Sequence, residues 1–290
     1  MRLHDYLVSQ YRVNHLGIKP SSMEQMRITV RLFSRHLGRD ATLDDLNAER
    51  IGTFLADYLE SGRSPATVNA KRRQLLSLWA DARRTGMCDN DVVRLRSARE
   101  QIKLPEAWST DHLQAIFRQA EQVQGEICGI RAADWWLSLC RVLACTGERI
   151  SACLSVLTAN VNLDQRLIVS EAISQKTSAT RLLVLTELAA AACRRIYNPN
   201  RWLMWPFPAT REQLDQSFVK LILGPAGVPY GRGRGGLFHK FRRTSGSLVE
   251  QAGGDGARHL GNTPEVFRRN YFDPRVLPPR SVELLEKFGL

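Results

Sequence analysis

The segment Phe238–Gly253, FHKFRRTSGSLVEQAG, decides how the second half of the chain folds. Its apolar residues recur at helical spacing, which predicts a helix over residues 237–251. His239 and Arg242 lie three residues apart at the start of this helix, so their side chains share one face. We therefore expect a cationic cluster where this helix begins.

Two more cationic residues lie upstream, in segments of different predicted structure. Arg149 follows a Thr-Gly turn and opens a helix in TGERISACLSV. Lys176 lies at the polar tip of a hairpin predicted from two runs of β-forming residues, 167–170 and 181–185. Downstream, Tyr271 lies in RRNYFDP, beyond a Leu-Gly-Asn turn. Each residue alone has an ordinary structural explanation, such as a solvated helix end or a half-buried aromatic.

The rest of the pattern predicts a chain that is mainly α-helical, with a small β-sheet or hairpin. A helix is expected over residues 64–86, because Ser-Pro opens it and a glycine follows its end. Ser21-Ser22 with Glu24 predicts a capped helix start. Residues 94–108 lack a sustained apolar period and contain a proline, which indicates a linker. Further helices are predicted near residues 22–37, 47–62, 109–123, 132–145, 186–197 and 211–222, with a short amphipathic piece at 282–288.

The composition is that of a folded soluble protein with a polyanionic partner. The 290 residues hold 41 Lys and Arg against 29 Asp and Glu, a formal net charge of +12, and the pI is near 9.9. Basic side chains that neutralise phosphates release condensed counterions, so this excess favours nucleic acid. No run approaches the ~18–20 apolar residues of a membrane span, and the N-terminus lacks the apolar core of a signal peptide. We expect a cytoplasmic protein with no membrane partner.

The sequence also lacks the usual signatures of metal and cofactor sites. Its six cysteines form no CxxC pair and have no spacing suited to zinc, so we interpret most of them as small buried hydrophobes. There is no Gly-rich phosphate loop and no acidic cluster for magnesium. We expect no metal and no cofactor, so that any chemistry depends on side chains alone.

The helix over 64–86 carries cations on one turn and again at its C-terminal end. A solvated helix face whose cations complement the helix dipole explains such a run about as well as a binding site does. Within an already basic domain, contact with a phosphate backbone is the better interpretation. The candidate DNA-binding residues are Lys71, Arg72, Arg73, Arg83 and Arg84, together with Arg243 beside Arg242.

The ordered set of cationic segments and tyrosine resembles the tyrosine recombinase (phage integrase) family. Arg149 matches the first catalytic arginine of that family, which lies in a Thr-Gly-x-Arg turn. Lys176, followed by a threonine, matches its hairpin lysine. His239 and Arg242 match its His-x-x-Arg box, and Tyr271 matches the tyrosine that follows a Leu-Gly-His/Trp turn.

The resemblance covers nearly the whole chain and implies the short, two-domain form of this DNA-breaking and rejoining architecture. A helical core-binding domain is expected over residues 1–95 and a linker over 96–107. A mixed catalytic domain is expected over 108–290, ending in a C-terminal tail, 276–290. The apolar stripe of this tail either packs on its own domain or, as the resemblance implies, docks into a neighbouring protomer.

The resemblance also implies roles for the site residues in cutting and rejoining DNA through a 3′-phosphotyrosyl intermediate. Two guanidiniums, Arg149 and Arg242, would stabilise the charge that builds on the phosphate. Tyr271 would be the nucleophile, with His239 taking or orienting its proton and Lys176 protonating the departing 5′-oxygen. The retained bond energy would allow resealing without ATP.

Several residues depart from the family pattern. Ala152 stands where the family often has an acidic residue, three positions after the first arginine. Asn262 replaces the imidazole or indole of the Leu-Gly-His/Trp turn, although its amide still donates hydrogen bonds. His259 is either a substitute for that group or a structural residue. The stretch between Arg242 and Asn262 is also about one helical turn shorter than is usual.

These observations favour a site-specific recombinase or integrase. Its expected partners are double-stranded DNA with a specific recombination site and further copies of itself, as a tetramer on DNA. Two alternatives stay open: a non-catalytic DNA-binding regulator with the same fold, and a type IB topoisomerase-like enzyme that relaxes DNA.

Overall fold

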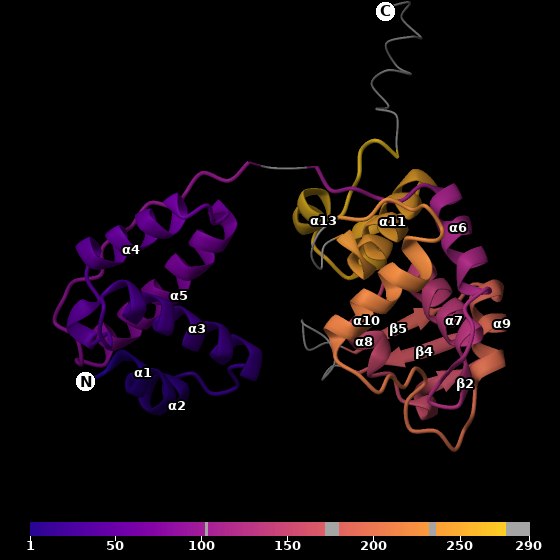
Figure 1. The fold of residues 1–290 in the computed structure, drawn as a ribbon, viewed down its shortest axis with the longest axis horizontal. Coiled ribbons are helices and arrows are strands. Elements are labelled where there is room, and N and C mark those ends of the chain that lie inside the picture. Colours follow the sequence, from indigo (N-terminus) through magenta and orange to yellow (C-terminus); the bar gives the residue numbers. More distant parts are fainter. Residues whose placement is uncertain (102–103, 172–179, 232–235, 277–290) are drawn as a thin grey trace, which may run out of the picture. The chain divides into compact units, whose positions relative to one another are not determined.

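The computed structural model describes residues 1–101, 104–171, 180–231 and 236–276 (Figure 1). The chain separates into two compact units, Met1–Ile102 and Lys103–Leu290. The predicted hairpin tip with Lys176, and all of the predicted tail 276–290 except its first residue, lie outside the described residues. None of the helices in the described ranges is long and apolar enough to cross a membrane.

The first unit is helical throughout its described elements. Its first helical stretch, which was not predicted from the sequence, comprises α1 (Leu3–Tyr6), η1 (Leu7–Tyr11) and α2 (Arg12–Asn14). The other elements are α3 (Pro20–His36), η2 (Leu43–Asp45), α4 (Ala48–Glu60) and α5 (Pro65–Arg84). Aromatic side chains such as Phe33, Phe54 and Trp79 fill its core. The predicted helices over 47–62 and 64–86 are confirmed, with Asn47 and Ser64 capping their first turns.

The predicted cap of the first long helix is wrong. Helix α3 begins at Pro20 rather than after Ser21-Ser22, and no side chain caps its N-terminus. Proline suits the first helical position because its φ angle is already helical and its missing N–H has no partner to lose there. The proline therefore outweighed the serine-glutamate signal one turn into the helix.

The second unit combines helices with one small antiparallel sheet, as the sequence predicts, and with a two-stranded hairpin that was not predicted. The hairpin is β1 (Glu126–Ile127) with β2 (Ile130–Arg131), and the three-stranded sheet runs β3 (Val161–Asn162), β4 (Leu167–Ser170), β5 (Arg181–Val184). Leu167 pairs with Val184 and Ser170 with Arg181, so β4 and β5 are the predicted hairpin strands. The helices are α6 (Thr110–Ala120), α7 (Ala132–Thr146), α8 (Ile150–Leu154), α9 (Glu187–Ile196), α10 (Arg211–Phe218), η5 (Val219–Leu223), α11 (Phe238–Gln251), α12 (Gly256–Leu260) and α13 (Pro264–Asn270); a short turn, η3 (Thr158–Asn160), precedes β3.

An aromatic cluster fixes the start of α11 in the core of the second unit. Phe238 stacks on Phe218 with ring centroids 4.2 Å apart, and it lies parallel to Trp136 of α7. All three side chains are buried. Since Phe238 precedes His239, this packing determines where the predicted cationic face begins.

The end of α11 packs closely with α12 and α13 through glycines. A Cβ added to Gly246 would lie 2.7 Å from a Leu260 methyl and 2.8 Å from the Phe267 ring. A Cβ on Gly256 would lie 2.5 Å from Phe267 and 2.6 Å from the carbonyl oxygen of Gly246. These contacts bring Tyr271, which follows α13, against the same small core.

We predict opposite effects for two helical glycine-to-alanine substitutions. Gly246→Ala forces a methyl group into buried side chains, so the free energy of unfolding falls by about 1–3 kcal/mol. Gly52→Ala in α4 meets nothing within 4 Å and gains helix propensity, so stability rises by up to about 1 kcal/mol. Urea denaturation of both variants checks this, and a Gly246→Ala variant as stable as the parent would contradict the packing described.

Candidate active site

The guanidinium of Arg242 links two distant segments at the centre of the second unit. Its Nη1 donates to the carbonyl oxygen of Gly147 at 2.7 Å, and its Nη2 donates to that of Leu260. The side chain is fully buried. Burial and the nearby charge of Arg149 lower the pKa of Arg242 to about 10. The arginine therefore joins the C-terminal ends of α7 and α12 while remaining a cation at neutral pH.

The turn that receives Arg242 requires glycine. Gly147 ends α7 in the left-handed conformation, with φ +59°. A Cβ at this position would lie 2.4 Å from a methyl of Leu260. The Thr-Gly turn of the sequence is thus both the helix end and the point where α12 approaches.

Tyr271 lies where α13 ends, beside both residues of the His-x-x-Arg pair. Its side chain is 8% exposed. The Arg242 guanidinium lies 5.1 Å from the centre of the tyrosine ring, and the His239 ring centre lies 5.2 Å from it. The predicted histidine, arginine and tyrosine are therefore neighbours, although about thirty residues separate the pair from the tyrosine.

Arg149 lies on the wall of an adjoining cavity of about 490 Å³. It is the residue before α8, half-buried, and it shares the cavity with His239, Ser151 and Arg211. Its charge also opposes that of Arg242, as the lowered pKa of Arg242 shows. Two arginines and a histidine thus border one space. The Glu148 carboxylate also lines this cavity but is paired with Arg181, so the cavity still suits an anionic ligand.

Asn262 carries an unused hydrogen-bond donor. It follows the left-handed Gly261 at the end of α12, and its backbone N–H donates to Ala257. The side-chain Nδ2 is buried and, within the described residues, has no hydrogen-bond partner, and the same holds for Nε of Arg242. Buried donors are rarely left unpaired in native proteins, so these two atoms fit a ligand with acceptor oxygens.

A buried ion pair beneath the site was missed by the sequence analysis. Glu148, 1% exposed, accepts from Arg181 Nη1 at 2.6 Å and from the backbone N–H of Arg149 at 2.6 Å. Arg181 Nη2 in turn donates to the His259 carbonyl oxygen at 2.7 Å. Glu148 lay inside the quoted TGERIS motif. Nothing in the sequence paired it with an arginine 33 positions away.

The Glu148–Arg181 pair provides a carboxylate close in sequence to Ala152, which stands where the family pattern often has an acidic residue. Ala152 is buried in α8 and offers no carboxylate. Glu148, immediately before Arg149, supplies a negative charge that raises the pKa of Arg242 against the opposing effects of burial and Arg149. A carboxylate is therefore present at this site, on a different residue.

His259 contacts the Glu148–Arg181 pair through its backbone and α11 through its ring. Its ring Nε2 lies 2.8 Å from the Ser245 hydroxyl on α11. Burial lowers the pKa of His259, and the charges of Arg181 and Arg242 lower it further. The imidazole thus bridges α12 to α11.

Arg211 and Phe238 are further site residues that the sequence analysis did not single out. The Arg211 guanidinium lies 5.1 Å from the centre of the Phe238 ring, and its Nε donates to Asp215 at 2.8 Å. The only sequence signal was the predicted start of a helix at residue 211.

The predicted DNA-binding residues fall into different environments. Lys71 was expected to project, yet it is 6% exposed, and burial lowers the pKa of its ammonium. Arg72 is half-buried, and its Nη1 donates to the carbonyl oxygen of Leu95 at 2.8 Å. Arg73 is exposed. Arg243 is half-buried beside the site, with Nε 3.3 Å from the Asn270 carbonyl oxygen.

The two arginines at the end of α5 are exposed and ion-paired. Arg83 contacts Asp91 at 3.0 Å, and Arg84 contacts Asp81 at 2.5 Å. Both guanidiniums keep free donor capacity, because each pair uses a single nitrogen of the fork. Arg73, Arg83 and Arg84 are thus the accessible cations of this helix among the candidates.

In the described parts of the chain, no three His, Cys, Asp or Glu side chains are grouped so as to hold a metal ion. Cys88, Cys140, Cys153 and Cys193 are buried. Burial raises the pKa of the thiol of Cys153, which suits an inert core residue.

Breaking the buried pair should cost far more than breaking a surface pair. Glu148→Gln leaves Arg181 without its charged partner, so the free energy of unfolding falls by about 3 kcal/mol. Glu187→Gln removes the exposed partner of Arg194 and changes stability by no more than about 0.5 kcal/mol. Urea denaturation measures both, and equal losses would show that the buried pair has no special weight.

The lowered pKa of His259 predicts acid sensitivity. Below about pH 6.5 the unfolded chain binds a proton that the folded site disfavours, so this part of the stability, complete above that pH, declines as the pH falls further. His259→Gln should reduce the difference in unfolding free energy between pH 7.5 and pH 5. The surface variant His4→Gln is the control, and a pH difference unchanged in His259→Gln would contradict the assignment.

Comparisons with known proteins bear on the fold of the chain. No family model matches the chain. A putative tyrosine recombinase XerC of Pseudomonas aeruginosa is 24% identical over 190 residues, which are 62% of this chain and 44% of that protein. The match thus spans less than half the length of this relative.

Solved structures share the fold. A lambda integrase dimer bound to a COC′ core site matches with a TM-score of 0.72 and 19% identity, over 96% of this chain and 79% of that one. The Tn1549 transposon integrase in complex with a circular intermediate DNA matches with a TM-score of 0.73 and 14% identity, over the whole of both chains. The chain thus has the fold of these integrases and is similar in sequence to a protein described as a putative tyrosine recombinase.

Proposed function

We propose that this protein is a site-specific DNA recombinase that cuts and rejoins DNA strands through Tyr271. The observation that carries the proposal is the meeting of Tyr271 with His239 and Arg242, beside a cavity bordered by Arg149. These residues come from three separate segments and place cationic side chains around a phenol. That is the environment a phenol needs in order to attack a phosphodiester.

In the proposed cleavage step, the Tyr271 oxygen bonds to phosphorus as the bond from phosphorus to the 5′-oxygen breaks. The phenolic proton passes to His239, and the departing 5′-oxygen takes a proton from Lys176, which lies outside the described residues. Arg149 and Arg242 stabilise the charge on the non-bridging oxygens. Rejoining is the reverse step, with a 5′-hydroxyl attacking the phosphotyrosyl bond.

Asn262 and Arg242 have the donors to complete the phosphate site. Nδ2 of Asn262 and Nε of Arg242 are buried without a hydrogen-bond partner in the described structure. A non-bridging phosphate oxygen would satisfy such donors. This supports a binding role for Asn262 despite the replacement of the family's imidazole or indole.

The proposed partner is duplex DNA, contacted by residues of both units. The net charge of +12 and the exposed Arg73, Arg83 and Arg84 support contact of the first unit with phosphates. We assign residues 1–95 as the core-binding domain, 96–107 as the linker and 108–290 as the catalytic domain. A structural relative is a lambda integrase tetramer bound to a Holliday junction, with a TM-score of 0.70 and 18% identity; we propose that this chain likewise forms a tetramer on DNA.

The first experiment identifies a DNA site and tests for covalent chemistry. DNA duplexes that the protein retains from a randomised pool at moderate salt identify its site. These duplexes are then rebuilt with a nick, so that the strand fragment bearing the 5′-hydroxyl diffuses away after cleavage and cannot rejoin. The parent chain should form a covalent adduct that survives denaturing electrophoresis. Specific retention without any adduct would support the non-catalytic regulator instead, and relaxation of supercoiled plasmid without joining of two sites would support the topoisomerase-like alternative.

Tyr271→Phe should abolish the adduct, because it removes the attacking oxygen while keeping the ring. Tyr197→Phe, on an exposed tyrosine, is the matched control and should form adduct at the parent rate. Arg149→Ala should slow adduct formation by about 10²–10³-fold, as loss of one donor to a developing oxyanion does. An adduct that persists in Tyr271→Phe would rule out the proposed nucleophile.

A further inference from the structure

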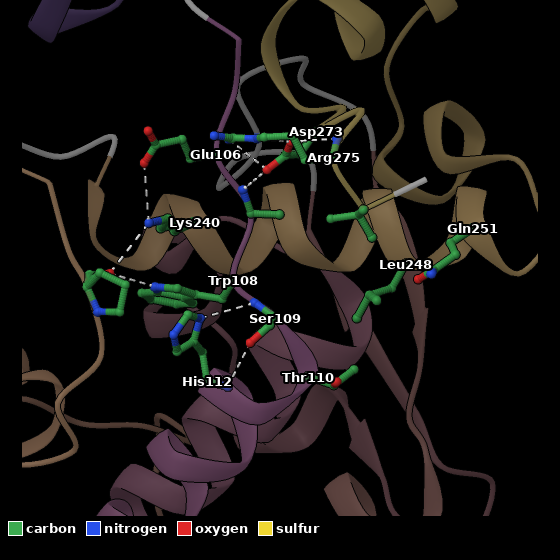
Figure 2. A pocket seen from close by; sticks show the side chains of 13 residues that line it. Glu106, Trp108, Ser109, Thr110, His112, Lys240, Leu248, Gln251, Asp273 and Arg275 are labelled. Atoms are coloured by element: carbon green, nitrogen blue, oxygen red, sulfur yellow. Dashed lines mark hydrogen bonds and ion pairs between the residues drawn. The ribbon is translucent and has the colours of Figure 1, made fainter. Parts of the chain in front are cut away.

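The segment after Tyr271 is fastened to the beginning of the second unit by one buried carboxylate. Asp273 is 3% exposed. Its Oδ2 accepts from the backbone N–H of Ala107 at 2.8 Å, and both oxygens accept from the Arg275 guanidinium, at 2.8 and 2.9 Å. Figure 2 shows Asp273 and Arg275 side by side above α11, beside the cavity that Glu106 and Trp108 also line.

A single hydroxyl connects this carboxylate segment to the tyrosine itself. The Ser247 Oγ on α11 accepts from the backbone N–H of Asp273 at 2.9 Å and donates to the backbone carbonyl oxygen of Tyr271 at 3.3 Å. The hydroxyl is buried, so water does not compete for either bond. The main chain on the C-terminal side of Tyr271 is thus held to α11 and to residue 107.

The other end of this attachment is firmly placed. The backbone N–H of Trp108 donates to the Thr244 hydroxyl at 2.8 Å, and its indole N–H donates to the Pro229 carbonyl oxygen at 2.9 Å. The indole is buried against Phe241. Arg275 also reaches the Pro105 carbonyl oxygen at 3.2 Å. Asp273 therefore bonds to a segment that the core already fixes.

The carboxylate is suited to hold this attachment at neutral pH. Burial alone would raise the pKa of Asp273, but the hydrogen bonds from Arg275 and Ala107 outweigh it and lower the pKa. A charged carboxylate accepts all of these bonds at once.

We propose that Asp273 is a positioning residue that holds Tyr271 for attack, acting through Ser247 and the backbone. This inference rests on the proposed function. Helix α13, on the other side of the tyrosine, has only seven residues, so it holds its own end weakly. A displacement of about 1 Å at a nucleophile slows a reaction by up to about 10²-fold. The attachment through Asp273, on the C-terminal side of Tyr271, limits such a displacement.

The test separates DNA binding from the cleavage step. In Asp273→Asn, single-turnover adduct formation on the selected nicked duplex should slow by about 10–100-fold, while the dissociation constant for DNA stays within twofold of the parent. Ser247→Ala should also slow adduct formation, and this variant replaces Asp273→Asn in the test if Asp273→Asn folds poorly. Asp134→Asn breaks another Arg–carboxylate pair, with Arg131 at the start of α7, and should leave the rate unchanged.

Two further readouts distinguish positioning from other defects. A duplex with sulfur in place of the bridging 5′-oxygen has a leaving group that needs no proton, so it rescues a defect in leaving-group protonation but should not rescue Asp273→Asn. Amide hydrogen exchange at residues 270–273, without DNA, should speed up in Asp273→Asn and not in Asp134→Asn.

Several outcomes would overturn the assignment: an adduct rate within twofold of the parent, a loss explained by weaker DNA binding, rescue by sulfur, or unchanged hydrogen exchange. The absence of adduct in the parent chain is a different result, because it contradicts the proposed function itself.

Discussion

The buried guanidinium of Arg242 is the constraint on which the candidate site depends. It bonds to carbonyl oxygens at the ends of α7 and α12, two segments more than a hundred residues apart, and its planar fork has the right shape for two acceptors at once. Those bonds fix the turn before Arg149 and the turn before Asn262 in one step. Arg242 is also one of the two cations proposed to stabilise the reacting phosphate. The same side chain would therefore serve both the fold of the site and its chemistry.

Close packing and a buried ion pair stabilise this arrangement of cationic side chains. Gly147, Gly246 and Gly256 let helices α7, α11, α12 and α13 approach to distances that a side chain at these positions would prevent. The Glu148 carboxylate, paired with Arg181, places a negative charge beside Arg242, on the residue before Arg149 rather than three residues after it. The carboxylate that the resemblance leads one to expect three residues after Arg149 therefore has a counterpart within the same turn.

Local signals in the sequence predicted most of the long helices and the candidate residues of the site. Contacts between distant segments could not be predicted from such signals. Helix α5 was predicted because its caps and apolar stripe are local. Lys71 was misplaced on its surface, although its spacing from Val68 and Leu75 is that of the buried face. The short helices α12 and α13 have little periodicity to detect. The Glu148–Arg181 pair and the Asp273 attachment to Ala107 depend on tertiary structure, and no spacing rule connects residues 33 or 166 positions apart.

The central claim is that Tyr271, within this cationic enclosure, bonds covalently to DNA. Mass spectrometry of the trapped adduct after nuclease and trypsin digestion tests it most directly. The account predicts a nucleotide attached through its 3′-phosphate to Tyr271 in the peptide Asn270–Arg275. A nucleotide on any other residue, or one attached through a 5′-phosphate, would contradict it.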